Sequence, residues 1–272
     1  MKQENKTWRK KETPQTQRKE SPRTPKSSEG EILYGINPVI EAMKAGKRRI
    51  IELFVPDDKH SERIDALVKD AEVKGISVIK TSSAHIRTIS GTEFHQNVVA
   101  RVSPYPFADL ADVLGKKGDI PPFLLILDGV EDPMNLGALS RTALGAGVDA
   151  ILIPKDRAAL PTPTAVKASA GALEHIPVVL ITNINNTIRD LKKEGFWITG
   201  LDGDAKVAFY ECDFTSALAL VIGGEGKGLR DLVGKSCDNL AFIPQKGPVE
   251  SLNASVAGAI AMYEVVRQRY GR

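Results

Sequence analysis

The chain has 272 residues, of which 42% are hydrophobic and 26% charged, and its formal net charge is +3. This length suits one large or two modest domains, and the composition is ordinary for a globular protein. No apolar run approaches the roughly 18 residues needed to span a membrane, and the basic, polar N-terminus lacks the apolar region of a secretory signal. The two cysteines, Cys212 and Cys237, have no metal-ligand spacing, which argues against a zinc site or a disulfide framework and fits a reducing cytoplasm.

The basic excess is concentrated at the N-terminus. Residues 1–29 hold nine Lys and Arg and four Glu, whereas the rest of the chain holds 28 basic and 30 acidic residues. This segment is rich in Pro, Thr, Ser and Gln and nearly free of apolar residues, so residues 1–30 are predicted to be a disordered tail. A basic, flexible arm suits a phosphate backbone, although a solvated linker would have the same composition.

Residues 31–104 predict a small α/β domain. Asn37 and Pro38 read as the N-cap and first position of a helix that stops at Gly46. Apolar spacing then predicts further helices and strands. The strands are expected at 50–55, 76–79 and 97–102, and the helices at 61–74 and 82–89.

A second domain is predicted over residues 121–272, after a linker at residues 105–120 that is rich in Pro and Gly. Strands and helices alternate, which indicates an α/β fold with a mainly parallel sheet and helices on both faces. The strands are expected at 123–127, 150–153, 178–181, 196–201, 217–222 and 240–243, and the helices at 135–145, 164–169, 184–193 and 254–268. In such sheets a ligand binds beyond the carboxyl ends of the strands.

Glycine and polar residues gather at those strand ends, but they match no common nucleotide motif. The turn after residues 123–127 lacks the G-x-G-x-x-G of dinucleotide-binding folds. Residues 223–228 have the glycines of a phosphate loop, but Leu229 and Arg230 stand where Lys and Ser or Thr are required. A hydrolase G-x-S-x-G turn is absent, and the four histidines are scattered, so no metal site is expected.

The last strand, loop and helix predict one wall of a pocket. An apolar run at 240–243 reads as a buried strand, and a loop containing Gly and Pro follows it at 244–248. Ser251 and Asn253 then precede a helix rich in small residues, where backbone donors and the positive end of the helix dipole are available.

Three stretches resemble the motifs of the SpoU (TrmH) branch of the SPOUT methyltransferases. They are Asp128-Gly-Val-Glu-Asp-Pro-Met-Asn-Leu-Gly-Ala-Leu-Ser-Arg, Leu220-Val-Ile-Gly-Gly-Glu-Gly-Lys-Gly-Leu and Ile243-Pro-Gln-Lys-Gly-Pro-Val-Glu-Ser-Leu-Asn-Ala-Ser. All three occur in order and at strand ends. Residues 31–104 are similar to the ribosomal-protein-like RNA-binding domain of family members that methylate 23S rRNA.

This resemblance implies an S-adenosylmethionine-dependent RNA ribose 2′-O-methyltransferase that has a C-terminal trefoil knot and forms a homodimer through the knotted domain. It implies that Arg141 activates the 2′-hydroxyl, either by its charge, which we favour, or as a base. The other residues implied at the catalytic site are Asn135, Glu225, Ser251 and Asn253. Those implied to bind the cofactor are Gly200, Leu201, Gly223, Ile243 and Leu252.

Three alternatives remain open from the sequence. A tRNA ribose methyltransferase fits the same motifs, although family members that act on tRNA often lack the N-terminal domain. A non-catalytic RNA-binding or ribosome-assembly factor could keep the fold, but the intact Asn135, Arg141, Glu225 and Asn253 argue against it. A nucleotide-binding enzyme that uses residues 223–228 as a phosphate loop is disfavoured by the missing Lys and Ser or Thr.

Overall fold

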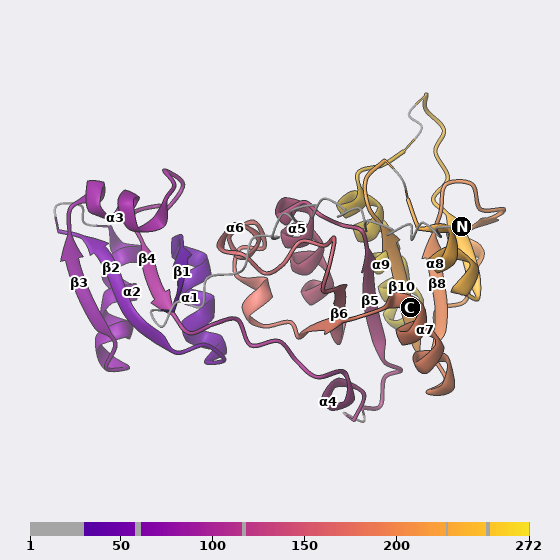
Figure 1. Cartoon of the computed structure of the whole chain (residues 1–272), viewed down its shortest axis with the longest axis horizontal. Coiled ribbons are helices and arrows are strands. Elements are labelled where there is room, and N and C mark those ends of the chain that lie inside the picture. Colours follow the sequence, from indigo (N-terminus) through magenta and orange to yellow (C-terminus); the bar gives the residue numbers. More distant parts are fainter. Residues whose placement is uncertain (1–29, 58–60, 116–117, 227, 249–250, 272) are drawn as a thin grey trace, which may run out of the picture.

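The structure is a computed structural model of the chain and describes residues 30–57, 61–115, 118–226, 228–248 and 251–271. These residues form two sheets that follow one another along the long axis of the molecule (Figure 1). The predicted tail at residues 1–30 lies outside the described residues apart from Gly30. No helix within the described ranges is long and apolar enough to cross a membrane.

The first sheet has four strands in the order β1-β4-β2-β3. β2 pairs parallel with β3 and antiparallel with β4. Its strands are β1 (Glu31–Tyr34), β2 (Ile50–Pro56), β3 (Ser77–Thr81) and β4 (Val99–Val102). The helices of this part are α1 (Ile36–Ala45), α2 (Glu62–Val73) and α3 (Ser83–Ser90). The short β1 was not predicted, since four residues are too few to display a clear alternation of apolar and polar side chains.

The predicted start of the first helix is wrong. α1 begins at Ile36 and its N-cap is Gly35, so Asn37 lies two positions further into the helix than predicted. The Asn37 side chain instead accepts a hydrogen bond from Arg63 Nη2 at 2.6 Å. Gly35 has a φ of +98°, a backbone conformation that an asparagine cap does not require and that glycine adopts at little cost. The predicted stop at Gly46 is confirmed, with a φ of +63°.

The second sheet has seven strands in the order β7-β6-β5-β10-β8-β11-β9. All six pairings are parallel, as predicted for this half of the chain. The strands are β5 (Phe123–Asp128), β6 (Ala150–Pro154), β7 (Val178–Ile181), β8 (Trp197–Leu201), β9 (Val207–Ala208), β10 (Leu218–Gly223) and β11 (Asn239–Phe242). The two-residue β9 was not predicted. β11 is only half-buried, contrary to the prediction: Ala241 is buried, whereas Leu240 and Phe242 are partly exposed.

Helices cover both faces of this sheet (Figure 1). The helical segments are α4 (Leu110–Leu114), α5 (Pro133–Gly145), α6 (Pro163–Ala168), η1 (Ala172–Glu174), α7 (Ile184–Lys193), η2 (Phe209–Glu211), α8 (Asp231–Ser236) and α9 (Ala254–Tyr270). Alternate residues of β5 belong to two different cores. Leu125 and Leu127 pack in the core that includes α5, α6 and α9, whereas Leu124 and Ile126 pack in the core that includes α4, α7 and α8. This follows from the two-residue period of a strand that is buried on both faces.

The two sheets are joined by a buried charge cluster as well as by apolar contacts. The Arg48 side chain, only 2% exposed, donates to Glu31 Oε2 at 2.5 Å and to Glu174 Oε1 at 3.3 Å. Arg48 Nε also donates to the Ser103 carbonyl at 2.9 Å. Burial raises the pKa of Glu174, and the neighbouring Arg48 opposes this rise. Because Arg48 precedes β2 and Glu174 ends η1, their pairing connects the first sheet to the helices of the second.

Replacing Arg48 with methionine is expected to lower the free energy of unfolding by about 3–5 kcal/mol, because the change leaves a buried carboxylate without its cation. Urea denaturation at pH 8 measures this loss, and exposed Arg49→Met is the matched control. The pKa of Glu174 is higher in the folded protein than in the unfolded chain. Protonation of Glu174 at low pH therefore stabilises the fold, and this contribution is lost as the pH rises and the carboxyl group ionises. The deficit should therefore be smaller at pH 5 than at pH 8; an equal loss at both pH values would contradict this account.

Candidate active site

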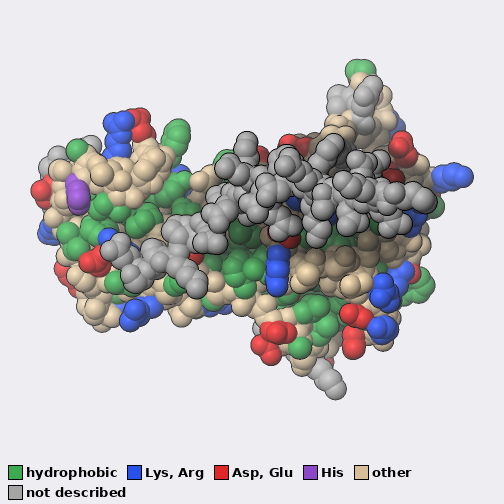
Figure 2. All heavy atoms as spheres, viewed as in Figure 1, with side chains coloured by type: hydrophobic (Ala, Val, Ile, Leu, Met, Phe, Trp, Pro, Cys, Tyr) green, Lys and Arg blue, Asp and Glu red, His purple; other side chains and the backbone are tan. Residues whose placement is uncertain are grey.

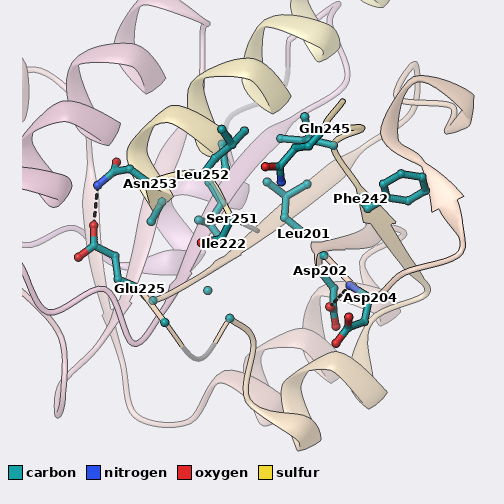
Figure 3. A pocket seen from close by; sticks show the side chains of 18 of the residues that line it. Leu201, Asp202, Asp204, Ile222, Glu225, Phe242, Gln245, Ser251, Leu252 and Asn253 are labelled. Atoms are coloured by element: carbon teal, nitrogen blue, oxygen red, sulfur yellow. Dashed lines mark hydrogen bonds between the residues drawn. The ribbon is translucent and has the colours of Figure 1, made fainter. Parts of the chain in front are cut away.

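A pocket of about 540 Å³ lies at the carboxyl edge of three adjacent strands, β8, β10 and β11, where the N-terminus of α9 meets them. Parallel strands bring their carboxyl ends to one edge, which is where ligands bind in sheets of this kind. Seven of the ten site residues expected from the sequence line this pocket: Leu201, Gly223, Glu225, Ile243, Ser251, Leu252 and Asn253. In Figure 3, Glu225 and Asn253 lie at one end of the pocket and Asp202 and Asp204 at the other.

Close backbone packing explains the glycines at the end of β10. A side chain at Gly223 would collide with the Gly228 backbone, and one at Gly224 would collide with the Gly129 carbonyl. The loop folds back through a hydrogen bond from Gly228 N to the Gly224 carbonyl at 3.2 Å. It is also tied to β5, because Gly224 N donates to the Asp128 carbonyl at 2.8 Å. The glycines therefore allow three backbone segments to meet at one point.

An ion pair attaches the C-terminal end of this loop to β5. The Asp128 side chain is fully buried at the end of β5 and accepts hydrogen bonds from Arg230 N at 2.9 Å and Arg230 Nε at 2.5 Å. Both carboxylate oxygens are thus bonded by one residue, which places Arg230 at the end of the glycine loop. Sequence reasoning did not assign this pair, although the position of an acidic residue directly after a buried apolar strand was a signal for Asp128.

Asn135, Glu225 and Asn253 meet beside the pocket, although they come from α5, the loop after β10 and the start of α9. Glu225 Oε1 accepts from Asn135 Nδ2 at 2.8 Å and from Asn253 Nδ2 at 2.5 Å. Asn253 Nδ2 also lies 3.1 Å from Asn135 Oδ1. The side-chain oxygen of Asn253, Oδ1, accepts from Ser255 N at 2.8 Å and Val256 N at 3.4 Å, so Asn253 is the N-cap of α9. One side chain therefore links a helix start to a carboxylate.

Three predicted residues are absent from the pocket lining: Asn135, which lies beside the pocket, Gly200 and Arg141. Gly200 is buried within β8. An added Cβ there would lie 2.6 Å from Leu229 Cδ1 and 2.9 Å from Leu240 Cδ2, so Gly200 allows close packing of these side chains on the strand. Arg141 is exposed on α5, and no hydrogen bond or ion pair joins it to another described residue. Besides Arg141 and Arg267, the large side chains exposed on α5 and α9 are Met134, Leu144, Val256, Tyr263 and Tyr270.

No group of three or more His, Cys, Asp or Glu side chains among the described residues is placed to hold a metal ion. Cys212 and Cys237 are both free thiols. Burial raises the pKa of Cys237 to about 12, so its reactive thiolate form is scarce near neutral pH.

Comparison with known sequences decides the family. The profile of the SpoU rRNA methylase family matches residues 122–263, and a profile for RNA 2′-O ribose methyltransferase substrate binding matches residues 32–108. The chain belongs to the SpoU rRNA methylase family. The first match covers the second sheet with the pocket, and the second covers the four-stranded sheet.

Individual relatives extend this similarity over most of the chain. The chain is 44% identical over 239 residues to the 23S rRNA (guanosine-2′-O-)-methyltransferase RlmB of Coxiella burnetii, covering 87% of this chain and 95% of the relative. It is 40% identical to RlmB of Escherichia coli K12, covering 88% and 99%. Among solved structures, AviRb of Streptomyces viridochromogenes in complex with AdoMet matches with a TM-score of 0.74 and 25% identity, covering 89% and 91%.

Proposed function

We propose that this SpoU-family protein transfers a methyl group from S-adenosylmethionine to the ribose 2′-hydroxyl of a guanosine in 23S rRNA. The observation that carries the proposal is the convergence of all three motif segments on one pocket edge. The similarity to RlmB proteins over nearly their whole length supports the nucleotide and the RNA. It also favours a cytoplasmic protein, since that is where bacterial rRNA is found.

The pocket fits S-adenosylmethionine in size and in chemistry. Its volume of about 540 Å³ lies within the roughly 300–1,000 Å³ of small-molecule sites. Leu201, Ile222 and Leu252 supply apolar surface for an adenine ring, and the carboxylates of Asp202 and Asp204 can receive hydroxyl or ammonium groups. Bound S-adenosylmethionine supplies an electrophilic methyl group on a positively charged sulfur.

The chain's own residues must activate and orient the 2′-hydroxyl, which is a weak nucleophile at neutral pH. Transfer would form a bond between the 2′-oxygen and the methyl carbon; the electron pair of the carbon–sulfur bond would stay on sulfur, and the hydroxyl proton would pass to solvent water. We assign Arg141 to stabilising the negative charge that develops on this oxygen, because a free guanidinium stays protonated and is a poor base. Asn135, Glu225 and Asn253 hold one another in place and orient the ribose, and Ser251 supports the substrate or the cofactor loop.

This assignment requires Arg141 to reach a pocket that it does not line in its own chain. A homodimer through the exposed faces of α5 and α9 would bring it there. Met134, Leu144, Val256 and Tyr263 are each more than 40% exposed, and apolar patches of this kind commonly mark protein interfaces. We further propose that the second domain contains a C-terminal trefoil knot, in which the chain after the motif at residues 220–229 threads a loop, as the family resemblance implies.

We also propose a separate role for each of three segments of the chain. Residues 31–104 would bind the RNA substrate, and residues 121–272 would catalyse methyl transfer. Residues 105–120 would form the linker between these two domains. The substrate-binding profile over residues 32–108 supports the first assignment. This N-terminal unit favours rRNA over tRNA as the substrate.

The test uses the full-length protein, labelled S-adenosylmethionine, and 23S rRNA and tRNA from cells lacking the gene. We expect the label in 23S rRNA at one guanosine, mapped by its resistance to alkaline cleavage. Labelling of tRNA alone would favour the tRNA enzyme, whereas RNA binding without transfer to either RNA would favour a non-catalytic factor.

The substitution Asn253→Asp separates helix capping from catalysis. The new carboxylate still accepts from Ser255 N, so the melting temperature should change little. It cannot donate to Glu225 and places a second negative charge beside it, so the methylation rate should fall by about tenfold or more. The assay compares melting curves and single-turnover rates with those of Asn253→Ala, which loses both the cap and the donor. Wild-type rates in Asn253→Asp would exclude a role for the donor.

A further inference from the structure

Two more hollows continue along the carboxyl edge beyond the cofactor pocket. A hollow of about 550 Å³ shares Gly224 and Glu225 with that pocket and includes Asn135. A second hollow, of about 970 Å³, lies at the ends of β6 and β7 and the start of α7. Arg157 and Arg230 line both hollows, so the two hollows adjoin at these side chains, between the Asn135–Glu225 contact and the start of α7. The two hollows together are called the groove.

Arg157 is the one cationic side chain of this groove that has no hydrogen bond or ion pair to another residue in the described part of the chain. Arg230 is bound to buried Asp128, as described above. The remaining charged side chains of the hollow next to the active site are acidic: Asp128, Glu131, Asp132 and Glu225. On the visible face of the molecule, basic and acidic side chains are interspersed rather than gathered by sign (Figure 2). An RNA strand in the groove therefore depends on a local cation rather than on a broad basic field.

The backbone at Arg157 is in an uncommon conformation that the fold enforces. Its φ is +54°, in the left-handed region that residues with a Cβ seldom occupy. The loop is fastened on both sides, by a hydrogen bond from Lys155 N to the Ile181 carbonyl at 3.0 Å and by one from Ala159 N to the Val130 carbonyl at 2.8 Å. Unfavourable backbone conformations that the surrounding structure enforces are often found at functional sites.

We propose that Arg157 binds the phosphodiester adjacent to the acceptor ribose, and that the RNA strand continues from there into the hollow at the start of α7. This inference rests on the proposed function, because it places the ribose beside Asn135 and Glu225. A guanidinium can form two parallel hydrogen bonds with a phosphate, which sets the direction of the strand as well as its affinity. Arg157 is thus a positioning residue for the RNA.

The test replaces Arg157 with Asn, which tolerates a positive φ and removes the charge without adding backbone strain. We expect RNA binding to weaken by about tenfold. The slope of log affinity against log salt should become shallower by about 0.7–0.9, as for the loss of one phosphate contact. Binding of S-adenosylmethionine and the melting temperature should not change, and Arg157→Lys should recover part of the loss. Lys193→Ala, at the far end of α7, is the matched control, with unchanged RNA binding.

A second experiment tests whether Arg157 contacts the phosphate next to the methylation site. The wild type and Arg157→Asn are compared on an rRNA fragment, with natural linkages or with one uncharged methylphosphonate next to the mapped methylation site. If Arg157 contacts that phosphate, the modified RNA should weaken wild-type binding by about tenfold and Arg157→Asn binding hardly at all. Equal losses in both proteins, or an Arg157→Asn defect only in kcat, would overturn the proposal. Failure of the wild type to methylate any RNA would instead reject the proposed function.

Discussion

Replacing Arg141 with alanine is expected to abolish methyl transfer, lowering the single-turnover rate by at least about 10³-fold, while S-adenosylmethionine still binds. The rate falls because no cation remains to stabilise the negative charge on the 2′-oxygen. Cofactor binding survives because the residues that line the pocket, among them Leu201 and Leu252, are unchanged. Calorimetry and a single-turnover assay with 23S rRNA measure the two effects.

The matched control is Arg189→Ala, which removes an exposed arginine from α7. Its turnover should equal that of the wild type. Arg141→Lys keeps a positive charge and should retain more activity than Arg141→Ala if the residue acts by its charge. Wild-type turnover in Arg141→Ala would remove the residue from the mechanism.

Mixed dimers test whether Arg141 acts on the partner's pocket. Refolding Arg141→Ala together with Gly223→Ala should restore about a quarter of wild-type activity, since half of the dimers are mixed and each has one complete site. Both parent proteins alone should be inactive. A mixture as inactive as its parents would place each site within a single chain.

Replacing Gly223 with alanine is the second change with a large expected effect. The added Cβ would collide with the Gly228 backbone, which cannot move aside as a flexible side chain could. Overpacking of this kind costs about 1–3 kcal/mol of stability. The glycine loop must shift to relieve it, and we expect the affinity for S-adenosylmethionine to fall by about 100-fold or more.

Calorimetry measures the affinity for S-adenosylmethionine, and thermal melting measures the stability. Gly118→Ala is the matched control, because among the described residues no atom beyond its chain neighbours lies within 4 Å of the added Cβ. This control should bind the cofactor like the wild type. Unchanged affinity in Gly223→Ala would show that the glycine loop does not shape the cofactor site.

Most secondary structure could be predicted because its signals are local. Residues 178–181 and 184–193 match β7 and α7, since the apolar run lies between Pro177 and Thr182 and the helical period lies between Asn183 and Gly195. The sequence correctly placed Asn253 just before the last helix, and the structure shows that it caps α9 through backbone groups two and three residues away. Where two local signals compete, as at Gly35 and Asn37, the prediction was wrong because glycine satisfied the backbone geometry.

The sequence by itself determined the parallel α/β class and the presence of three glycine and polar motifs at strand ends, because these depend on residue spacing along the chain. Only the tertiary structure decided that β10 lies between β5 and β8, and that Asn135, Glu225 and Asn253 share hydrogen bonds across 28 to 118 residues. It also separated Arg141 from the pocket of its own chain and connected the sheets through Arg48 and Glu174. Such contacts arise from the packing of whole elements, and no short-range pattern of side chains specifies them.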